Sequence, residues 1–289
     1  MHQIENETLR VQIREYGAEL TSIYNKKTGI EHLWNADEAF WPWHAPVLFP
    51  IVGRVLNDEI SIDGNRYELE KHGLARKLNF KVLEQSENKI VFALTSNDDT
   101  LKVYPYKFEF LIGYKVVGNK LVCSYEVLNR DTQEIHFSLG AHPAFNVPMG
   151  GTGKYEDYYI EFEQNENISR HHIDGDGFFD GRVTPILQGD NKLPLHSNMF
   201  ADDAYIFKDL QSRKVTIKSD LTPHSLAVSF PGFPYLGIWA KVGAPYVCIE
   251  PWLGCADTAN KPTDYKQKEA VLSLAVGEKL NREITIEAN

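Results

Sequence analysis

Apolar and polar residues alternate along this chain in short runs, and almost no stretch has the 3.6-residue periodicity of a helix. The alternation is clearest at residues 8–14, 107–116 and 121–128. Since successive side chains of a strand point to opposite faces of a sheet, each run predicts a strand with one buried face. Gly, Asn, Asp and Pro separate the runs, and Asp63-Gly64 is typical of a tight hairpin turn. Many short strands at such spacing predict an all-β fold, either a β-sandwich or a barrel.

The same pattern predicts how the chain is organised. Short helical turns are expected only near residues 101–104 and 264–268. Residues 34–50 combine tryptophans with prolines and are interpreted as a long loop, because proline interrupts both helices and sheet ladders. The tryptophans fit two roles equally well, stacking on a ligand ring or closing one end of the core. With no linker and no repeat of constant period, residues 1–289 are expected to form a single domain.

The composition excludes several classes of function. The formal net charge of −10 argues against nucleic acid and membrane surfaces as partners, although a local basic pocket could still hold an anion. Cys123, Cys248 and Cys255 each stand alone in their segment, and they predict neither a disulfide framework nor a zinc site. No secretory signal opens the chain, and no apolar run approaches membrane length. We therefore expect a soluble cytoplasmic protein, with a homodimer left open.

Two strand ends carry residues suited to acid/base chemistry. The alternating run at residues 134–139 ends shortly before His142, which precedes a proline. Glu250 likewise ends the run at residues 246–250 and precedes a proline. Because proline cannot donate to the ladder, it stops a strand and fixes the direction of the side chain before it. The two residues indicate an acid/base pair, whereas either one alone would fit an ordinary polar strand end.

Other motifs predict less chemistry. His171 and His172 are adjacent, so that on a strand they face opposite ways and cannot chelate one ion without a bend. The segment with Asp174, Asp176 and Gly177 lacks the later glutamate of a calcium loop and is interpreted as a polar turn. Neither a Gly-x-Ser-x-Gly elbow nor a phosphate-binding glycine loop occurs. The sequence therefore predicts no metal, nucleotide or serine hydrolase site.

Five segments together resemble a known family. They are Gly53-Arg54-Val55, Lys71-His72-Gly73, Gly140-Ala141-His142-Pro143-Ala144-Phe145-Asn146, Asp203-Ala204-Tyr205-Ile206-Phe207 and Cys248-Ile249-Glu250-Pro251-Trp252. In this order they are similar to the arginine, two histidine, aspartate and glutamate motifs of the aldose 1-epimerase (galactose mutarotase) family, and most closely to its LacX-like branch. The match extends over nearly the whole chain. The resemblance implies a large antiparallel β-sandwich.

The resemblance also implies an enzyme, an isomerase that interconverts the α and β anomers of an aldose. By analogy Glu250 is the catalytic base and His142 the catalytic acid, and the two exchange roles when the sugar ring closes. An ionised Glu250 is expected to favour the imidazolium form of His142, since opposite charges stabilise each other. No metal and no cofactor is implied.

Substrate-binding residues follow from the same motifs. Arg54 and His72 would hold the ring oxygen and neighbouring hydroxyls. Asp203 would bind a pair of hydroxyls, with Asp202 beside it as the alternative. These residues are expected to line one pocket together with the acid/base pair. The implied partner is a small sugar.

The substrate is left open between a free aldose and its 6-phosphate. Residues 74–76 resemble the hexose-6-phosphate epimerase branch, where basic side chains hold a phosphate. Arg54 and the Pro-Trp pair after Glu250 depart from that branch. A neutral aldose is predicted, because the chain is acidic and Asp203 would repel a nearby phosphate. A carbohydrate-binding protein without turnover is the alternative function; glycoside hydrolysis is disfavoured because it normally uses two carboxylates.

Overall fold

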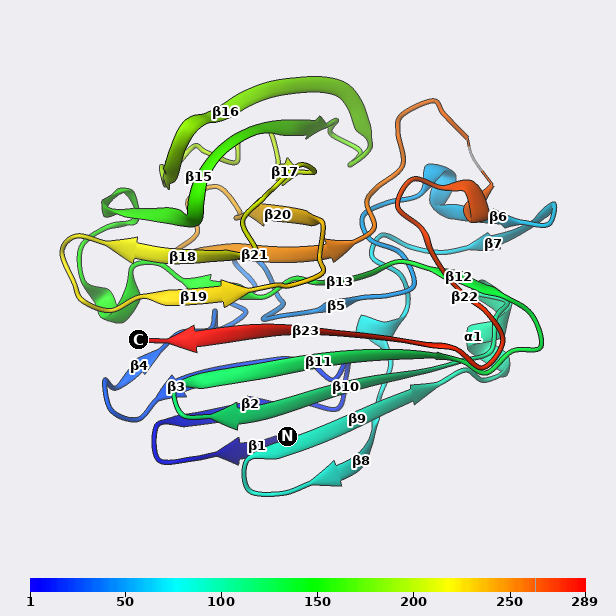
Figure 1. Ribbon diagram of the computed structural model, residues 1–289, viewed down its shortest axis with the longest axis horizontal. Coiled ribbons are helices and arrows are strands. Elements are labelled where there is room, and N and C mark those ends of the chain that lie inside the picture. Colours follow the sequence, from blue (N-terminus) through cyan, green and yellow to red (C-terminus); the bar gives the residue numbers. More distant parts are fainter. Residues whose placement is uncertain (263) are drawn as a thin grey trace.

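The computed structural model describes residues 1–262 and 264–289, and it is built mainly of antiparallel strands (Figure 1). The α-helix α1 (Asp98–Val103) is short and begins at Asn97, whose side chain accepts the N–H groups of Asp99 and Thr100. Five 3₁₀ turns cover Leu56–Asp58, Ala75–Lys77, Met149–Gly151, Tyr155–Asp157 and Tyr265–Gln267. The predicted all-β antiparallel fold is confirmed.

The largest sheet has 15 strands. They are β5 (Val47–Leu48), β8 (Lys81–Gln85), β9 (Lys89–Thr95), β10 (Phe108–Val117), β11 (Lys120–Asn129), β13 (Leu139–Ala141), β14 (Ala144–Asn146), β15 (Tyr158–Ile173), β16 (Phe179–Pro194), β17 (Tyr205–Phe207), β18 (Lys214–Ser219), β19 (Leu226–Ser229), β20 (Tyr235–Trp239), β21 (Tyr246–Leu253) and β23 (Lys279–Ala288). Their order is β5-β13-β21-β20-β17-β15-β18-β19-β23-β11-β10-β9-β8. In addition, β14 pairs with β21 and β16 pairs with β15.

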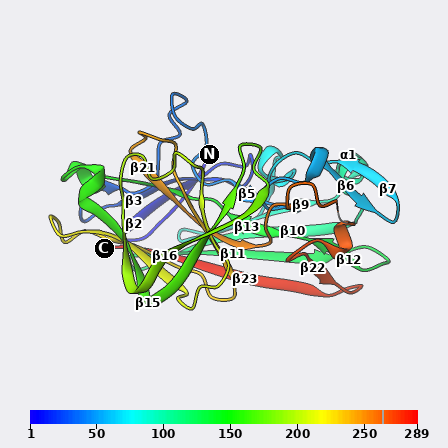
Figure 2. The same cartoon turned by 90° about the horizontal axis from the view of Figure 1, so that it is seen from above.

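Three smaller sheets complete the described part. One contains β1 (His2–Glu5), β2 (Leu9–Ile13), β3 (Leu20–Asn25) and β4 (Ile30–Glu31) in sequence order. The others are the pair of β12 (Ile135–Phe137) with β22 (Leu272–Leu274) and the hairpin of β6 (Glu59–Ile62) with β7 (Asn65–Glu68). This hairpin turns at Asp63-Gly64, as predicted, and projects from one end of the long axis (Figure 2).

The long strands follow the alternation seen in the sequence. In β10, Phe108, Phe110 and Ile112 are fully buried, and in β11 every second residue from Leu121 to Val127 is buried. A fully buried side chain of this size contributes about 1.5–3 kcal/mol, so these two strands carry a large share of the core. Most buried apolar residues form one continuous core that includes both Ile4 and Ala288. Among the described residues, no helix is long and apolar enough to cross a membrane.

Near the β5 end of the largest sheet, β21 brings neighbouring strands together at one place. β21 pairs with β13 and β14 on one side and with β20 on the other. Close packing here requires glycine, because a Cβ at Gly140 would lie 2.8 Å from the Trp252 ring and one at Gly237 would lie 2.6 Å from it. The β13 strand ends just before His142 and Pro143, and the chain re-enters the sheet at β14. The fold thus fixes the backbone around His142 on both sides.

Candidate active site

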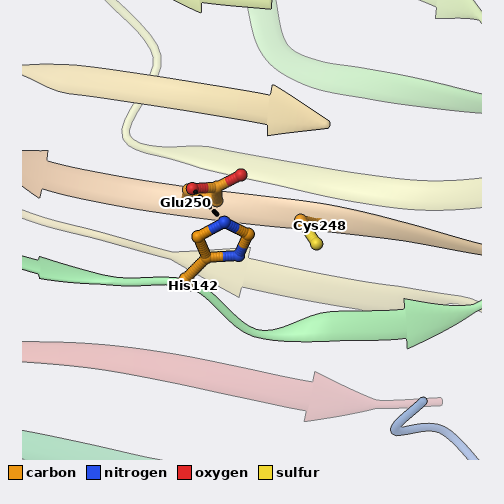
Figure 3. A group of neighbouring side chains, drawn as sticks. All are labelled: His142, Cys248 and Glu250. Atoms are coloured by element: carbon orange, nitrogen blue, oxygen red, sulfur yellow. Dashed lines mark ion pairs between the residues drawn. The ribbon is translucent and has the colours of Figure 1, made fainter. Parts of the chain in front are cut away.

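A histidine and a glutamate face each other where β13, β14 and β21 meet (Figure 3). His142 Nε2 lies 3.1 Å from Glu250 Oε2. Glu250 belongs to β21, opposite Gly237 of β20, and its side chain therefore projects from a strand with neighbours on both edges. His142 is 7% exposed and Glu250 is 2% exposed. Both ionisable groups are held away from bulk water.

Burial opposes the charged form of each group. It lowers the pKa of His142 to about 3 and raises the pKa of Glu250 well above its ordinary value. Because an isolated charge is costly in such surroundings, the pair is most stable when it holds one proton and no net charge. That proton sits on the carboxyl or on the ring. Burial disfavours the imidazolium expected from the sequence, so of these two forms the one with the proton on the carboxyl is favoured.

The pair lines a cavity of about 190 Å³ with aromatic walls. Trp41, Trp239 and Trp252 contribute to these walls. The ring of Trp41 stacks on the His142 imidazole, with ring centroids 4.8 Å apart and an interplanar angle of 26°. In the same segment Trp34 is buried, and its indole N–H donates to the Trp41 carbonyl over 3.0 Å. Residues 34–50 thus both close the core and line the cavity.

His72 lines the same cavity as a neutral imidazole. Its Nδ1 accepts the backbone N–H of Gly53 over 3.2 Å, which places the ring proton on Nε2. Burial holds the pKa of His72 well below its ordinary value. Gly53 has a φ of +73°, and a Cβ there would lie 2.7 Å from the Ala256 Cβ, so that only glycine fits. His72 can therefore donate one hydrogen bond from Nε2 to a ligand.

The structure separates the two neighbouring aspartates. Asp203 lines the cavity with His142 and Glu250, in a left-handed conformation with a φ of 64°. Asp202 is exposed and turns to His172, whose Nδ1 lies 3.0 Å from Asp202 Oδ2, and to Arg182. His172 also bonds the Thr184 hydroxyl, and it does not converge with His171 on a common ion. Of the two aspartates, Asp203 is the one placed to contact a ligand.

Sequence reasoning did not identify Arg170, a buried residue that supports Asp203. Its guanidinium donates to three consecutive carbonyl groups, those of Asp202, Asp203 and Ala204. It also lies over the Tyr205 ring, 4.3 Å from the centroid, and only 5% of Arg170 is exposed. These contacts hold the turn that directs the Asp203 carboxylate to the cavity. In the sequence, an arginine within an alternating strand gives no signal of such a role.

Arg54 lines an adjoining cavity and not the one that holds His72, His142 and Glu250. Its Nε and one terminal nitrogen donate to the two carboxylate oxygens of Asp58, each over 2.7 Å, and this ion pair raises the pKa of Arg54. The other terminal nitrogen donates to the Asp176 carbonyl over 3.2 Å. The adjoining cavity shares Lys71, Arg76, Gly177 and Asp203 with the first. Five residues were expected to line one pocket. The structure brings four of them together in one cavity, His72, His142, Asp203 and Glu250, and places Arg54 in the adjoining cavity.

Two basic residues lie between the cavities without an acidic partner. Lys71 and Arg76 line both cavities, and within the described residues neither has a carboxylate within 4.0 Å. Arg76 donates to the Lys71 carbonyl over 2.9 Å and lies over the Trp43 ring. The adjacent Lys77, by contrast, is paired with Glu70. Positive charge is therefore available where the two cavities join.

The antiparallel β-sandwich is the fold of galactose mutarotase-like proteins. Solved structures agree. A galactose mutarotase related enzyme from Lactobacillus acidophilus matches with a TM-score of 0.95 and 33% identity, over 100% of this chain and 97% of that one. A galactose mutarotase-like protein from Lactobacillus casei ATCC 334 matches with a TM-score of 0.93 and 33% identity, over 100% of both chains.

The chain belongs to the aldose 1-epimerase family, whose model matches residues 1–273. It is also 34% identical to the plasmid protein LacX of Lactococcus lactis subsp. lactis over 296 aligned residues, which cover 98% of this chain and 98% of that protein. The family and the LacX-like relationship predicted from the five motifs are confirmed.

Proposed function

We propose that the protein is an aldose 1-epimerase that interconverts the α and β anomers of a hexose. The observation that carries this proposal is the buried pair of His142 and Glu250, 3.1 Å apart, in one cavity with His72 and Asp203. Family membership supports the reaction class. A protein that only binds sugars needs the aromatic walls and hydrogen-bonding groups, but it has no use for a pair that shares a mobile proton.

The reaction begins with the pair in its charge-separated form, ionised Glu250 and protonated His142. Glu250 takes the proton of the C1 hydroxyl while His142 gives its proton to the ring oxygen, and the C1–O bond to the ring oxygen breaks. After rotation about the C1–C2 bond, the same two transfers run in reverse and close the ring on the other face. Positioned proton transfers of this kind contribute on the order of 10²–10⁴-fold in rate.

The pair has no net charge at any stage of this cycle. In the cyclic state Glu250 is an anion and His142 a cation, and in the open-chain state both are neutral. Since burial penalises an isolated charge, a cycle that conserves neutrality suits a site in which both groups are nearly inaccessible. We propose that this is why the two groups lie together.

Three further residues would bind the sugar. His72 donates from Nε2 to an oxygen near the ring, and Asp203 accepts from a pair of hydroxyls. Arg54 would act from the adjoining cavity, on the part of the substrate that extends beyond Lys71 and Arg76. The proposed chemistry uses no metal and no other cofactor. A cytoplasmic location, with a small sugar and neither nucleic acid nor membrane as partner, completes the proposal.

A neutral aldose is the proposed substrate, and a hexose 6-phosphate is the second candidate. Lys71 and Arg76 favour the second candidate, because they have no acidic partner and face both cavities. Asp203 favours the first, since its carboxylate lines both cavities and would repel a phosphate, and Asp176 also lines the adjoining cavity.

Polarimetry of freshly dissolved α anomers tests the reaction class. Wild-type protein should accelerate mutarotation of glucose or galactose well above the spontaneous and buffer-catalysed rate. A panel that includes the corresponding 6-phosphates ranks the two substrates. Binding of these sugars with no acceleration of mutarotation would instead identify a carbohydrate-binding protein.

A further inference from the structure

We propose that His142, Cys248 and Glu250 form a binding site for a thiophilic divalent cation such as Zn²⁺, and that the bound cation inhibits the enzyme. The inhibitory part rests on the proposed epimerase activity; the binding part does not. Among the described residues, these three are the one group of histidine, cysteine and carboxylate side chains close enough together to hold a metal ion.

The strand geometry places the three ligand groups on one side of β21. Cys248 and Glu250 are two residues apart on this strand, so their side chains point to the same face. Ala144 of β14 lies opposite Cys248 and brings the nearby His142 to that face. One ligand atom from each residue can be chosen so that all three lie within 4.8 Å of one another.

The distances suit a small cation after minor side-chain movement. Zn²⁺ binds sulfur at about 2.3 Å and nitrogen or oxygen at about 2.0–2.2 Å, so two of its tetrahedral ligands lie about 3.3–3.8 Å apart. His142 Nε2 and Glu250 Oε2 are 3.1 Å apart. The second ring nitrogen of His142 is buried and has no hydrogen-bond partner, and Figure 3 shows it on the side where Cys248 lies. His142 offers one of its two ring nitrogens to the ion.

Charge balance favours the complex. All three residues are nearly inaccessible to water, which disfavours an isolated thiolate or carboxylate. A divalent cation with one thiolate, one carboxylate and a neutral imidazole has no net charge, so burial does not oppose the complex as it opposes each anion alone. Binding releases the protons of the ligands to solvent.

The cavity next to the three ligands determines how accessible and how strong the metal site is. His142 and Glu250 line the cavity whereas Cys248 does not, so a bound ion would face the cavity with its remaining coordination position. Three protein ligands and one open position are typical of exchangeable sites. Lys71 and Arg76 line the same cavity and repel a cation, which makes the site weaker than a closed structural one. A cation here occupies both groups of the acid/base pair, and anomerisation stops.

Metal titrations of the intact protein test the proposal. Co²⁺ added to metal-free wild type should produce a thiolate-to-metal charge-transfer band with one ion per chain, and Zn²⁺ should displace it. Cys248→Ala should abolish the band and weaken Zn²⁺ binding by about ten-fold or more, equivalent to about 1.4 kcal/mol. Cys248→Ser provides a second variant if the alanine variant does not fold. Cys123→Ala is the matched control, because Cys123 is also buried but does not belong to the group of three ligand residues.

Activity measurements separate the two parts of the proposal. Zn²⁺ should inhibit wild type and Cys123→Ala, and EDTA should reverse this; Cys248→Ala should retain basal anomerisation and require about ten-fold more Zn²⁺ for inhibition. Equal metal binding by Cys248→Ala and wild type, or absence of the charge-transfer band, overturns the proposed site. If the charge-transfer band depends on Cys248 but neither wild type nor any variant catalyses anomerisation, the metal site stands and the proposed function fails.

Discussion

Glu250 Oε2 lies 3.1 Å from His142 Nε2, although Glu250 belongs to β21 and His142 to the short connection between β13 and β14. The contact joins two buried groups whose pKa values burial moves in opposite directions, down for the histidine and up for the glutamate. A proton can therefore pass between them, or through a sugar held next to them, without changing the net charge of the site.

The pH dependence of kcat/KM should form a wide bell. A second proton on the pair requires protonation of His142, whose pKa burial lowers to about 3, so the acid limb lies at low pH. Loss of the shared proton is moved to higher pH by the raised pKa of Glu250, and this loss sets the alkaline limb. Stopped-flow polarimetry across the pH range measures both limbs. A rate that climbs steadily through the alkaline range would be incompatible with a histidine acid.

The free energy of unfolding of the variant Glu250→Gln should increase relative to that of wild type as the pH rises. Burial raises the pKa of Glu250 above its ordinary value of 4.5, so above that pH the unfolded chain releases a proton that the folded protein retains. Wild type therefore loses about 1.4 kcal/mol per pH unit relative to the glutamine variant, until the folded pKa is reached. Urea unfolding of both proteins at pH 4 and pH 7 measures the difference. An equal difference at the two pH values would show that burial does not perturb Glu250.

Arg170→Met should weaken sugar binding through Asp203. Without the guanidinium, the carbonyls of residues 202–204 lose their donors and the Asp203 carboxylate loses its fixed direction. We expect KM to rise about ten-fold or more while kcat falls less. In an Asp203→Ala background the same substitution should raise KM little further, because Arg170 acts on the sugar only by orienting Asp203. Equal losses in both backgrounds would assign Arg170 a purely structural role.

Arg76→Ala should leave the preference between a free sugar and its 6-phosphate nearly unchanged. A charge-assisted hydrogen bond to phosphate contributes roughly 1.5–3 kcal/mol, or about ten-fold or more in affinity. The ratio of kcat/KM for glucose 6-phosphate to that for glucose reports this contact. Lys77→Ala is the control, since Lys77 is paired with Glu70 and does not line either cavity. A preference for the phosphate that disappears in Arg76→Ala would establish the hexose 6-phosphate as substrate.

The sequence predicted best the strands that bury one face along their length, and not simply the longest ones, since β16 has 16 residues and was missed. The runs at residues 107–116 and 121–128 match β10 and β11 closely, because each strand buries one face and shows it as alternation. β5 was missed inside a segment rich in proline, where only two residues pair. β16 was missed for a different reason: among the described strands it pairs with β15 alone, which leaves it an edge that tolerates proline and glycine.

For the site, the sequence marked residues that lie next to prolines or glycines and resemble family motifs. His72, His142 and Glu250 were found in this way, Asp203 was found from its family motif alone, and all four line one cavity. The pairing of Arg54 with Asp58 was not predicted. The two residues are four positions apart in an irregular segment, where the spacing does not fix the relative direction of their side chains. Arg170 was missed because the carbonyls that it binds come together only in the folded chain.

The rate of anomerisation by Glu250→Gln and His142→Asn tests the central claim most directly. Exchange between the α and β anomers of glucose or galactose, followed by NMR, gives the rate for each variant and for wild type. Circular dichroism checks that the fold is kept. If the pair carries the proton transfers, each variant should lose on the order of 10²–10⁴-fold in kcat, and the double variant should lose little more than the worse single one. Turnover within a few-fold of wild type in either variant would contradict the account and remove that residue from the mechanism.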